Sequence, residues 1–142
     1  MYGKVRFALD SVASLLMNEE RNKILDGTYP SNLIDGRQRK HIDGTKEFAD
    51  KRKSIKQYDP NAEPSKILPN IDVRELVDLY KGTGRIYFVQ GSPFPREDVK
   101  ADKVIGETWV MSLNKYVPTT VFTISYSKSG VHIFPVNERG RR

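Results

Sequence analysis

Residues 118–135, PTTVFTISYSKSGVHIFP, decide the fold of this chain. Side chains of residues 121–126 alternate between two faces, which is typical of a β-strand. The SKSG segment at 127–130 then predicts a hairpin turn, in which Gly130 adopts the positive φ that such turns need. Residues 131–134 form the returning strand, and Pro135 ends it. This hairpin displays hydroxyl groups, Lys128 and His132 close together.

Outward from the hairpin, the residues before it also alternate with a period of two. We predict strands at 85–90, 104–113 and 116–126, followed by 131–136, with residues 91–100 as a loop. The only tryptophan of the chain, Trp109, lies in the second of these strands. The pattern predicts a meander of about four antiparallel strands.

Helical patterns occupy the first half of the chain. Residues 5–25 carry apolar side chains at spacings of three and four, which predicts a helix with its apolar stripe against a core. Thr45 can cap a helix over 46–56, and Asp72 followed by Glu75 resembles a capping box for a helix over 71–81. Residues 57–70 contain three prolines and predict an irregular surface connection.

Helices followed by antiparallel strands indicate an α+β fold, with N-terminal helices packed on one face of a roughly four-stranded antiparallel sheet. We expect residues 1–142 to form a single domain. Its helical part covers 1–84 and includes a basic segment at 37–57. The sheet covers 85–136, and a basic tail covers 137–142.

Composition excludes several classes of protein. The chain has no cysteine, which excludes disulfides and thiolate chemistry, and it has two histidines without metalloprotease spacing. We therefore expect no metal and no cofactor, and we expect no membrane association because no apolar run reaches spanning length. The net charge is +6, and residues 37–57 contribute eight basic and three acidic side chains. Such a block indicates a polyanionic partner such as RNA, although a solvated lysine-rich helix face would look the same.

The polar residues that could carry chemistry are few, and they suit cleavage of RNA without a metal. A histidine pair can divide the roles of general base and general acid, because imidazole titrates near neutral pH. Lysine offers a charge to the phosphate, and serine or threonine offers hydrogen-bond donors. The candidates are Lys40, His41, Lys103, Thr119, Thr120, Ser125, Ser127, Lys128 and His132.

Each candidate also has a structural explanation. His41 could form a hydrogen bond at a helix entry, and His132 could be a half-buried strand residue. Lys103 could flank a strand, Thr120 could simply favour extended backbone, and Ser127 could serve the turn. Aromatic residues such as Trp109 could stack on bases or pack in the core.

The same segments resemble the polymorphic toxin type 50 domain, a bacterial toxin module also found attached to phage head-morphogenesis proteins. The matching pieces follow the family's order over residues 37–136. They are Lys40-His41-Ile42 with Gly44-Thr45, Tyr80-x-Gly82-Thr83-Gly84, Lys103-Val104-Ile105-Gly106, Thr119-Thr120, and Tyr126-Ser127-Lys128-x-Gly130-x-His132-Ile133 with Pro135. In the family a histidine often precedes the Tyr-Ser-Lys motif, whereas this chain has Ser125.

The resemblance implies a ribonuclease toxin related to barnase, EndoU and the colicin nucleases. It further implies a protein that acts in the bacterial cytoplasm after delivery by secretion or by a phage, with RNA, such as tRNA, as substrate and an immunity protein as partner. We therefore predict a metal-independent endoribonuclease that leaves a 2′,3′-cyclic phosphate. The alternatives are a non-catalytic nucleic-acid-binding module and an inactive phage virion or head-associated protein.

We predict His41 and His132 as the acid/base pair, without assigning the two roles. Lys103 would stabilise the phosphate, and Thr120 and Ser127 would donate hydrogen bonds to it. The RNA-binding residues would be Arg39, Lys40, Lys51, Arg52, Lys53 and Lys128.

Overall fold

The computed structural model describes the backbone of residues 2–138 and the side chains of residues 12–138. Its elements follow one another as α1 (Tyr2–Leu25), α2 (Asp35–Gln38), the 3-10 helix η1 (Arg39–His41), α3 (Lys46–Tyr58), β1 (Lys66–Ile67), α4 (Val73–Tyr80), β2 (Arg85–Phe88), β3 (Pro95–Lys100), β4 (Gly106–Val110), the 3-10 helix η2 (Met111–Leu113), β5 (Lys115–Thr119), β6 (Val121–Tyr126) and β7 (Val131–Pro135).

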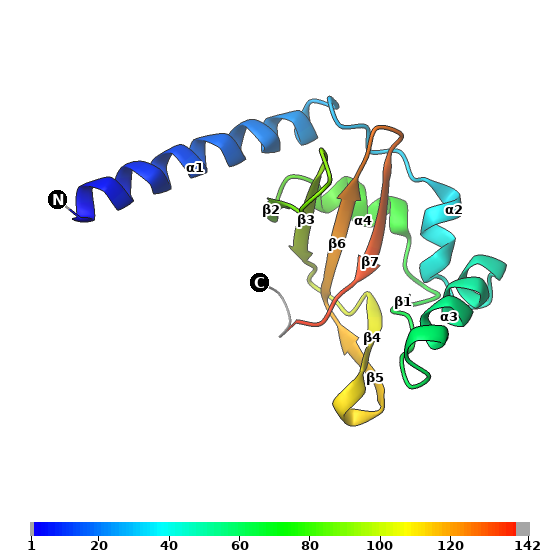
Figure 1. The fold of residues 1–142 in the computed structure, drawn as a ribbon. Coiled ribbons are helices and arrows are strands. Elements are labelled where there is room, and N and C mark those ends of the chain that lie inside the picture. The colour runs from blue at the N-terminus through cyan, green and yellow to red at the C-terminus, as the bar shows by residue number, and fades with distance from the viewer. Residues whose placement is uncertain (1, 139–142) are drawn as a thin grey trace.

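The strands form two antiparallel sheets, and the fold is α+β as predicted (Figure 1). The larger sheet has the order β2-β3-β6-β7, and the smaller one has the order β1-β4-β5. Helix α4 lies behind the larger sheet, while α2, η1 and α3 follow one another along its β7 edge (Figure 1). The basic tail at 137–142 falls mostly outside the described residues.

The core lies between the larger sheet and α4. Phe122 and Ile124 of β6 and Ile133 of β7 are fully buried there, together with Val77 of α4. The ring of Phe122 meets that of Tyr80 at the end of α4, edge to face, with centroids 6.0 Å apart. Because side chains alternate along a strand, the residues between these positions point to the opposite face of the sheet.

Both predicted helix caps are present. The Thr45 side chain accepts a hydrogen bond from the Phe48 backbone N–H at the start of α3, and the Asp72 side chain accepts one from the Glu75 N–H at the start of α4. Each satisfies one of the amide groups that a helix leaves unpaired at its N-terminus.

The β6–β7 hairpin has the predicted turn. Gly130 has a φ of 141°, and a Cβ atom added there would lie 2.3 Å from the Asn32 carbonyl oxygen. The segment before α2 therefore lies directly against the turn. This close approach also explains why Val131 N–H donates to the Asn32 carbonyl and Ile34 N–H donates to the Val131 carbonyl.

A single side chain completes the edge of β7. The Gln38 amide donates to the Ile133 carbonyl at 3.0 Å, and its oxygen accepts from the Ile133 N–H at 2.8 Å. Gln38 is 4% exposed, so these are buried hydrogen bonds. Since an unpaired sheet edge carries free N–H and C=O groups, Gln38 here replaces part of a neighbouring strand.

The prediction of a loop at 91–100 was wrong for its second half, which forms β3 in the middle of the larger sheet. Two acidic side chains make this strand look like a loop in the sequence, yet both are buried. The Glu97 carboxylate accepts hydrogen bonds from the N–H groups of Gly82 and Gly84 and from the Tyr126 hydroxyl. These contacts explain the glycine motif at 80–84 as structural, because it presents two backbone donors to a buried carboxylate.

Two further predictions about strands need correction. Residues 116–126 do not form one strand but divide at Thr120 into β5 and β6, which belong to different sheets. The connection at 57–70 is irregular as expected except for the short strand β1, which pairs with β4.

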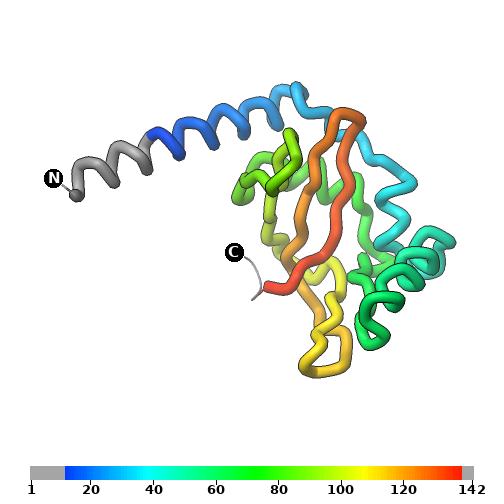
Figure 2. The backbone as a smooth tube through the Cα atoms, viewed as in Figure 1, coloured from blue at the N-terminus to red at the C-terminus, as the bar shows by residue number. Residues whose placement is uncertain are grey.

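Helix α1 is present, but its apolar stripe does not face a core in the part described. Val12, Leu15 and Leu16 are each at least half exposed, and the helix projects away from the sheets (Figures 1 and 2). The predicted stripe residues at 5–9 lie outside the described side chains. Among the described side chains of α1, those in its C-terminal half anchor the helix: Met17 packs against the core, Ile24 is buried, and the Arg21 guanidinium donates to the carbonyls of Gly82 and Gly84.

Candidate active site

The structure brings His41 and His132 together. Their rings stack with centroids 6.1 Å apart and planes 12° from parallel. Phe134, on the same face of β7 as His132, lies 5.4 Å from His41 and 5.7 Å from His132, centroid to centroid. His41 is 4% exposed, whereas His132 is only partly buried. Two histidines that are distant in the chain therefore share one site at the β7 edge.

The neighbours of the imidazoles favour their neutral forms. His41 Nε2 lies 3.4 Å from Lys51 Nζ of α3, and His41 Nδ1 lies 3.4 Å from Ser65 Oγ, just before β1. His132 Nδ1 is buried and has no hydrogen-bond partner among the described residues. A lysine that faces a ring nitrogen donates to the neutral imidazole and repels the protonated one.

Burial and positive charge lower the pKa of both histidines. Burial is the main reason that the pKa of His41 falls to about 3, and the charge on Lys51 is the next. The pKa of His132 falls to about 4, again mainly through burial and then through the charge on Arg37. Burial and the neighbouring Lys40 also lower the pKa of Lys51. The site is thus a desolvated, electropositive pair of bases, suited to a polyanion that would neutralise the surrounding charge.

A row of side chains crosses the sheet from His132. In register, His132 of β7 pairs with Ser125 of β6, and Ser125 pairs with Arg96 of β3. Directly opposed residues point to the same face, so this row lies on the face opposite α4. The Arg96 guanidinium also lies 5.7 Å from the Phe134 ring centroid.

Sequence reasoning missed Arg37, Ser65 and Arg96. Arg96 was assigned to a loop, and only the register of β3 reveals its place near His132. Arg37 belongs to the basic block that was noted, but its proximity to His132 depends on how α2 packs along β7. No signal in the sequence pointed to Ser65.

Three predicted residues do not join the histidines. Lys103 lines a small pocket with Tyr80 and Asp72, on the α4 side of the sheet. Thr120 precedes β6 and donates its hydroxyl hydrogen to Glu138; at roughly 3.3 Å per residue it is about 16 Å along the strand from Ser125. The Ser127 hydroxyl donates to the Gly130 carbonyl and accepts from the Ser129 N–H, which is turn chemistry.

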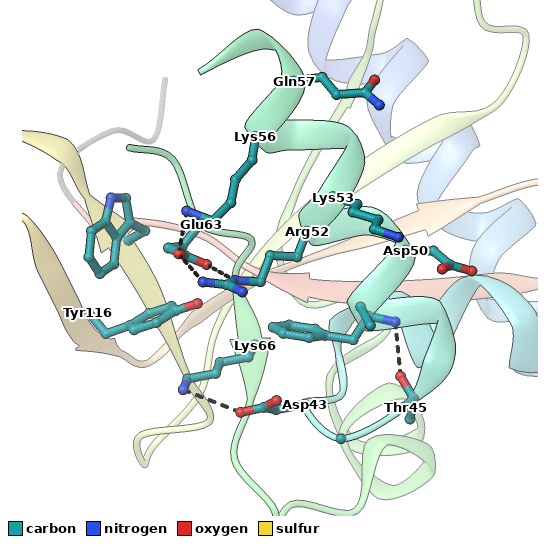
Figure 3. Close-up of a pocket in the computed structure, with 14 residues that line it drawn as sticks. Asp43, Thr45, Asp50, Arg52, Lys53, Lys56, Gln57, Glu63, Lys66 and Tyr116 are labelled. Atoms are coloured by element: carbon teal, nitrogen blue, oxygen red, sulfur yellow. Dashed lines mark hydrogen bonds and ion pairs between the residues drawn. The ribbon is translucent and has the colours of Figure 1, made fainter. Parts of the chain in front are cut away.

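The predicted RNA-binding residues divide into separate groups. Lys51 contacts His41, and Lys40 lies near enough to affect both histidines. Arg39 is engaged with Glu47, and Lys128 is exposed at the hairpin turn. Arg52 and Lys53 instead line a groove on another side of α3 (Figure 3).

Ion pairs hold the wall of that groove. Arg52 Nε lies 2.6 Å and Lys56 Nζ 2.7 Å from the Glu63 carboxylate, which fixes the segment after α3 against the helix (Figure 3). The hydrogen bonds from Arg52 are the main cause that lowers the pKa of Glu63 to about 2. The carboxylate therefore stays ionised throughout the physiological range.

Comparison with known proteins identifies a relationship over most of the chain. The family model described as bacterial toxin 50 matches residues 33–135, which include both histidines, Lys51, Ser65 and Arg96. No curated protein matches the chain. Among the described residues, no helix is long and apolar enough to cross a membrane.

Proposed function

The chain belongs to the bacterial toxin 50 family, and from this premise we propose that it is a metal-independent endoribonuclease toxin. The reaction would be attack of a ribose 2′-hydroxyl on the adjacent phosphate, which leaves a 2′,3′-cyclic phosphate. The observation that carries the proposal is the stacked pair of His41 and His132 in a site rich in cations. A purely structural role would not require two stacked imidazoles surrounded by Lys51, Lys40, Arg37 and Arg96.

The proposed mechanism divides two proton transfers between the histidines. One neutral imidazole takes the proton of the 2′-hydroxyl as the new O–P bond forms. The other, in its protonated form, gives a proton to the 5′ oxygen as the P–O bond breaks. Each transfer contributes about a hundred- to ten-thousand-fold to the rate. His132, the more exposed of the two, would meet the substrate directly.

Substrate binding would supply the protonated form that the free site lacks. Lys40, Lys51, Arg37 and Arg96 repel a proton on the histidines in the free protein. A bound phosphate diester would neutralise part of this charge, and it would thereby raise the pKa of the nearby imidazoles. The same cations would stabilise negative charge on the phosphoryl oxygens in the transition state.

RNA in general, with tRNA as one candidate, would be the substrate, and an immunity protein would protect the producing cell. Binding through Arg39, Lys40, Lys51 and Lys128 would weaken steeply as salt concentration rises, because each phosphate contact releases counterions. Delivery from outside and action in the cytoplasm of the target bacterium belong to the same proposal.

A non-catalytic nucleic-acid-binding module is the second candidate. The observation that favours it is the burial of His41, which has Lys51 rather than a carboxylate beside it. In this case the histidines would only shape the cationic face. Binding would persist when either histidine is replaced.

The test is cleavage of total cellular RNA in the presence of a chelator by the wild-type chain, His41→Ala and His132→Ala. We expect discrete fragments with cyclic phosphate ends from the wild type and a loss of at least a hundredfold in each variant. Lys103→Ala serves as the matched control, since Lys103 lies away from the histidines. RNA binding with no cleavage by the wild type would support the binding module instead. Cleavage that both histidine variants retain would refute the histidine pair as the catalytic residues.

A further inference from the structure

A groove of about 920 Å³ lies between α3 and the β4–β5 hairpin (Figure 3). Arg52, Lys53 and Lys56 line it from α3, and Trp109 and Tyr116 line it from the hairpin. The proposed chemistry at the histidines uses none of these side chains. The groove is therefore a separate feature that needs its own explanation.

Two aromatic rings form one wall of the groove. Trp109 and Tyr116 are direct partners across β4 and β5, and their rings meet edge to face with centroids 5.2 Å apart. The Tyr116 hydroxyl donates to the Pro64 carbonyl, and Lys66 Nζ lies 4.2 Å from the Tyr116 ring centroid. The hydrogen bond to Pro64 thus holds Tyr116 in place, and the edge-to-face contact with Tyr116 supports Trp109, while both side chains remain only partly buried. Fixed, accessible aromatic rings are what unpaired nucleobases stack on.

The helix side of the groove offers charge. Arg52 and Lys56 are paired with Glu63, and Lys66 is paired with Asp43. Lys53 is exposed and has no ion-pair partner among the described residues. The groove therefore combines one available cation with an aromatic wall and paired charges, a mixture that suits a nucleotide better than an apolar ligand.

The groove adjoins the histidine site through two short segments. Ser65 contacts His41, and the next residue, Lys66, lines the groove. Likewise Asp43, two residues after His41, lies in the groove wall. A strand of RNA bound at the histidines would have to extend only a few nucleotides to reach Tyr116.

We propose that this groove is a subsite for single-stranded RNA beside the scissile phosphate. One unpaired base stacks on the Trp109 ring, which Tyr116 supports edge to face, and a neighbouring phosphate contacts Lys53. This assignment rests on the proposed function insofar as the bound strand is the substrate of the histidine site. The groove would then restrict binding to unpaired stretches of RNA, because the base that stacks in it must be free of any RNA helix.

Trp109 is the only tryptophan, so its fluorescence reports on the groove alone. The experiment is a titration of the full chain with a 2′-O-methyl RNA octanucleotide of mixed sequence, which lacks the attacking hydroxyl. We expect saturable quenching of Trp109. A labelled form of the same oligonucleotide, followed by anisotropy, measures affinity for variants that lack the fluorophore.

Three variants make the test specific. Trp109→Leu should weaken binding roughly five- to hundredfold, the range expected for loss of one stacked base. Lys53→Glu, an exposed change that leaves the aromatic wall intact, should weaken binding and reduce its salt dependence. Lys103→Glu makes the same change of net charge in the pocket beside α4, away from the groove, and its affinity for the octanucleotide should stay close to that of the wild type.

The outcomes separate this proposal from the nuclease proposal. Binding that leaves Trp109 fluorescence unchanged, or Lys53→Glu that binds no worse than Lys103→Glu, overturns the subsite whether or not RNA is cleaved. Quenching and variant effects without cleavage support the subsite and refute the nuclease. Absence of any binding to the octanucleotide at low salt overturns the subsite, while cleavage of cellular RNA would still stand.

Discussion

Replacing Lys51 with methionine should raise the pKa of His41, because Lys51 Nζ lies 3.4 Å from His41 Nε2. Methionine keeps most of the side-chain volume and removes only the charge. At this distance two unit charges repel by about 1 kcal/mol with the dielectric constant of water and by about 5 kcal/mol with an effective value of about 20. The pKa of His41 falls from 6.5 to about 3, which corresponds to about 5 kcal/mol in all.

Burial is the largest cause of that lowering and the charge on Lys51 is the second, so Lys51 supplies only part of it. Lys51 is also partly exposed, and solvent screens its charge. We therefore expect Lys51→Met to remove about 1 to 2 kcal/mol of repulsion against protonated His41, which raises the pKa of His41 by about one.

The assay is a proton NMR titration of the imidazole resonances. The chain has two histidines, and a His132→Gln sample assigns the two signals. Lys53→Met is the control, because it removes an equal charge two residues further along α3 on an exposed position. A His41 pKa that is unchanged or lower in Lys51→Met, or one that moves equally in Lys53→Met, would refute the electrostatic account of the pair.

Two further predictions concern stability. Both histidines have a lower pKa when folded than the usual 6.5, so the unfolded chain binds more protons below that pH and stability must fall as pH drops from 6.5 toward 4. Between pH 6.5 and pH 5, His41 alone should lower the free energy of unfolding by about 2 kcal/mol, and His132 should lower it by less because it is partly exposed. Urea unfolding at the two pH values tests this, and a urea midpoint that does not fall at pH 5 contradicts it. Gln38→Leu should lower the free energy of unfolding by about 2 to 5 kcal/mol, because it leaves the buried N–H and C=O of Ile133 without hydrogen-bond partners. Thermal unfolding of this variant and of Arg37→Leu, an exposed control, measures the difference.

Local patterns were sufficient to predict the parts of this fold that depend on neighbours in sequence. Thr45, Asp72 and Gly130 act within three or four residues of themselves, and each has the predicted role. Strand β3 was missed because its stability depends on distant partners. Glu97 looks like a loop residue until the donors of Gly82 and Gly84 are known, and those lie just before the neighbouring strand β2.

The candidate site was predictable as a list of residue types but not as a constellation. His41 and His132 were chosen for their titration range, and nothing in the spacing of the sequence shows that their rings stack. Lys103 and Thr120 were chosen by the same chemical reasoning, yet the strand register and the division of the sheets at Thr120 place them elsewhere. Arg96 shows the converse, because a residue without any local signal lies in register with His132 through Ser125.

The geometry of the pair depends on how the edge of β7 is closed. A neighbouring strand at that edge would occupy the space that η1 fills, and His41 could not then stack on His132. Gln38 instead pairs with the backbone of Ile133 through one side chain, so the chain needs no further strand there and continues directly into η1, which begins at the next residue and ends at His41. His132 is the neighbour of Ile133 on β7 and faces away from the core. The hydrogen bonds between Gln38 and Ile133 thus fix where η1 lies along β7. They thereby also fix the position of the His41 ring relative to the His132 ring.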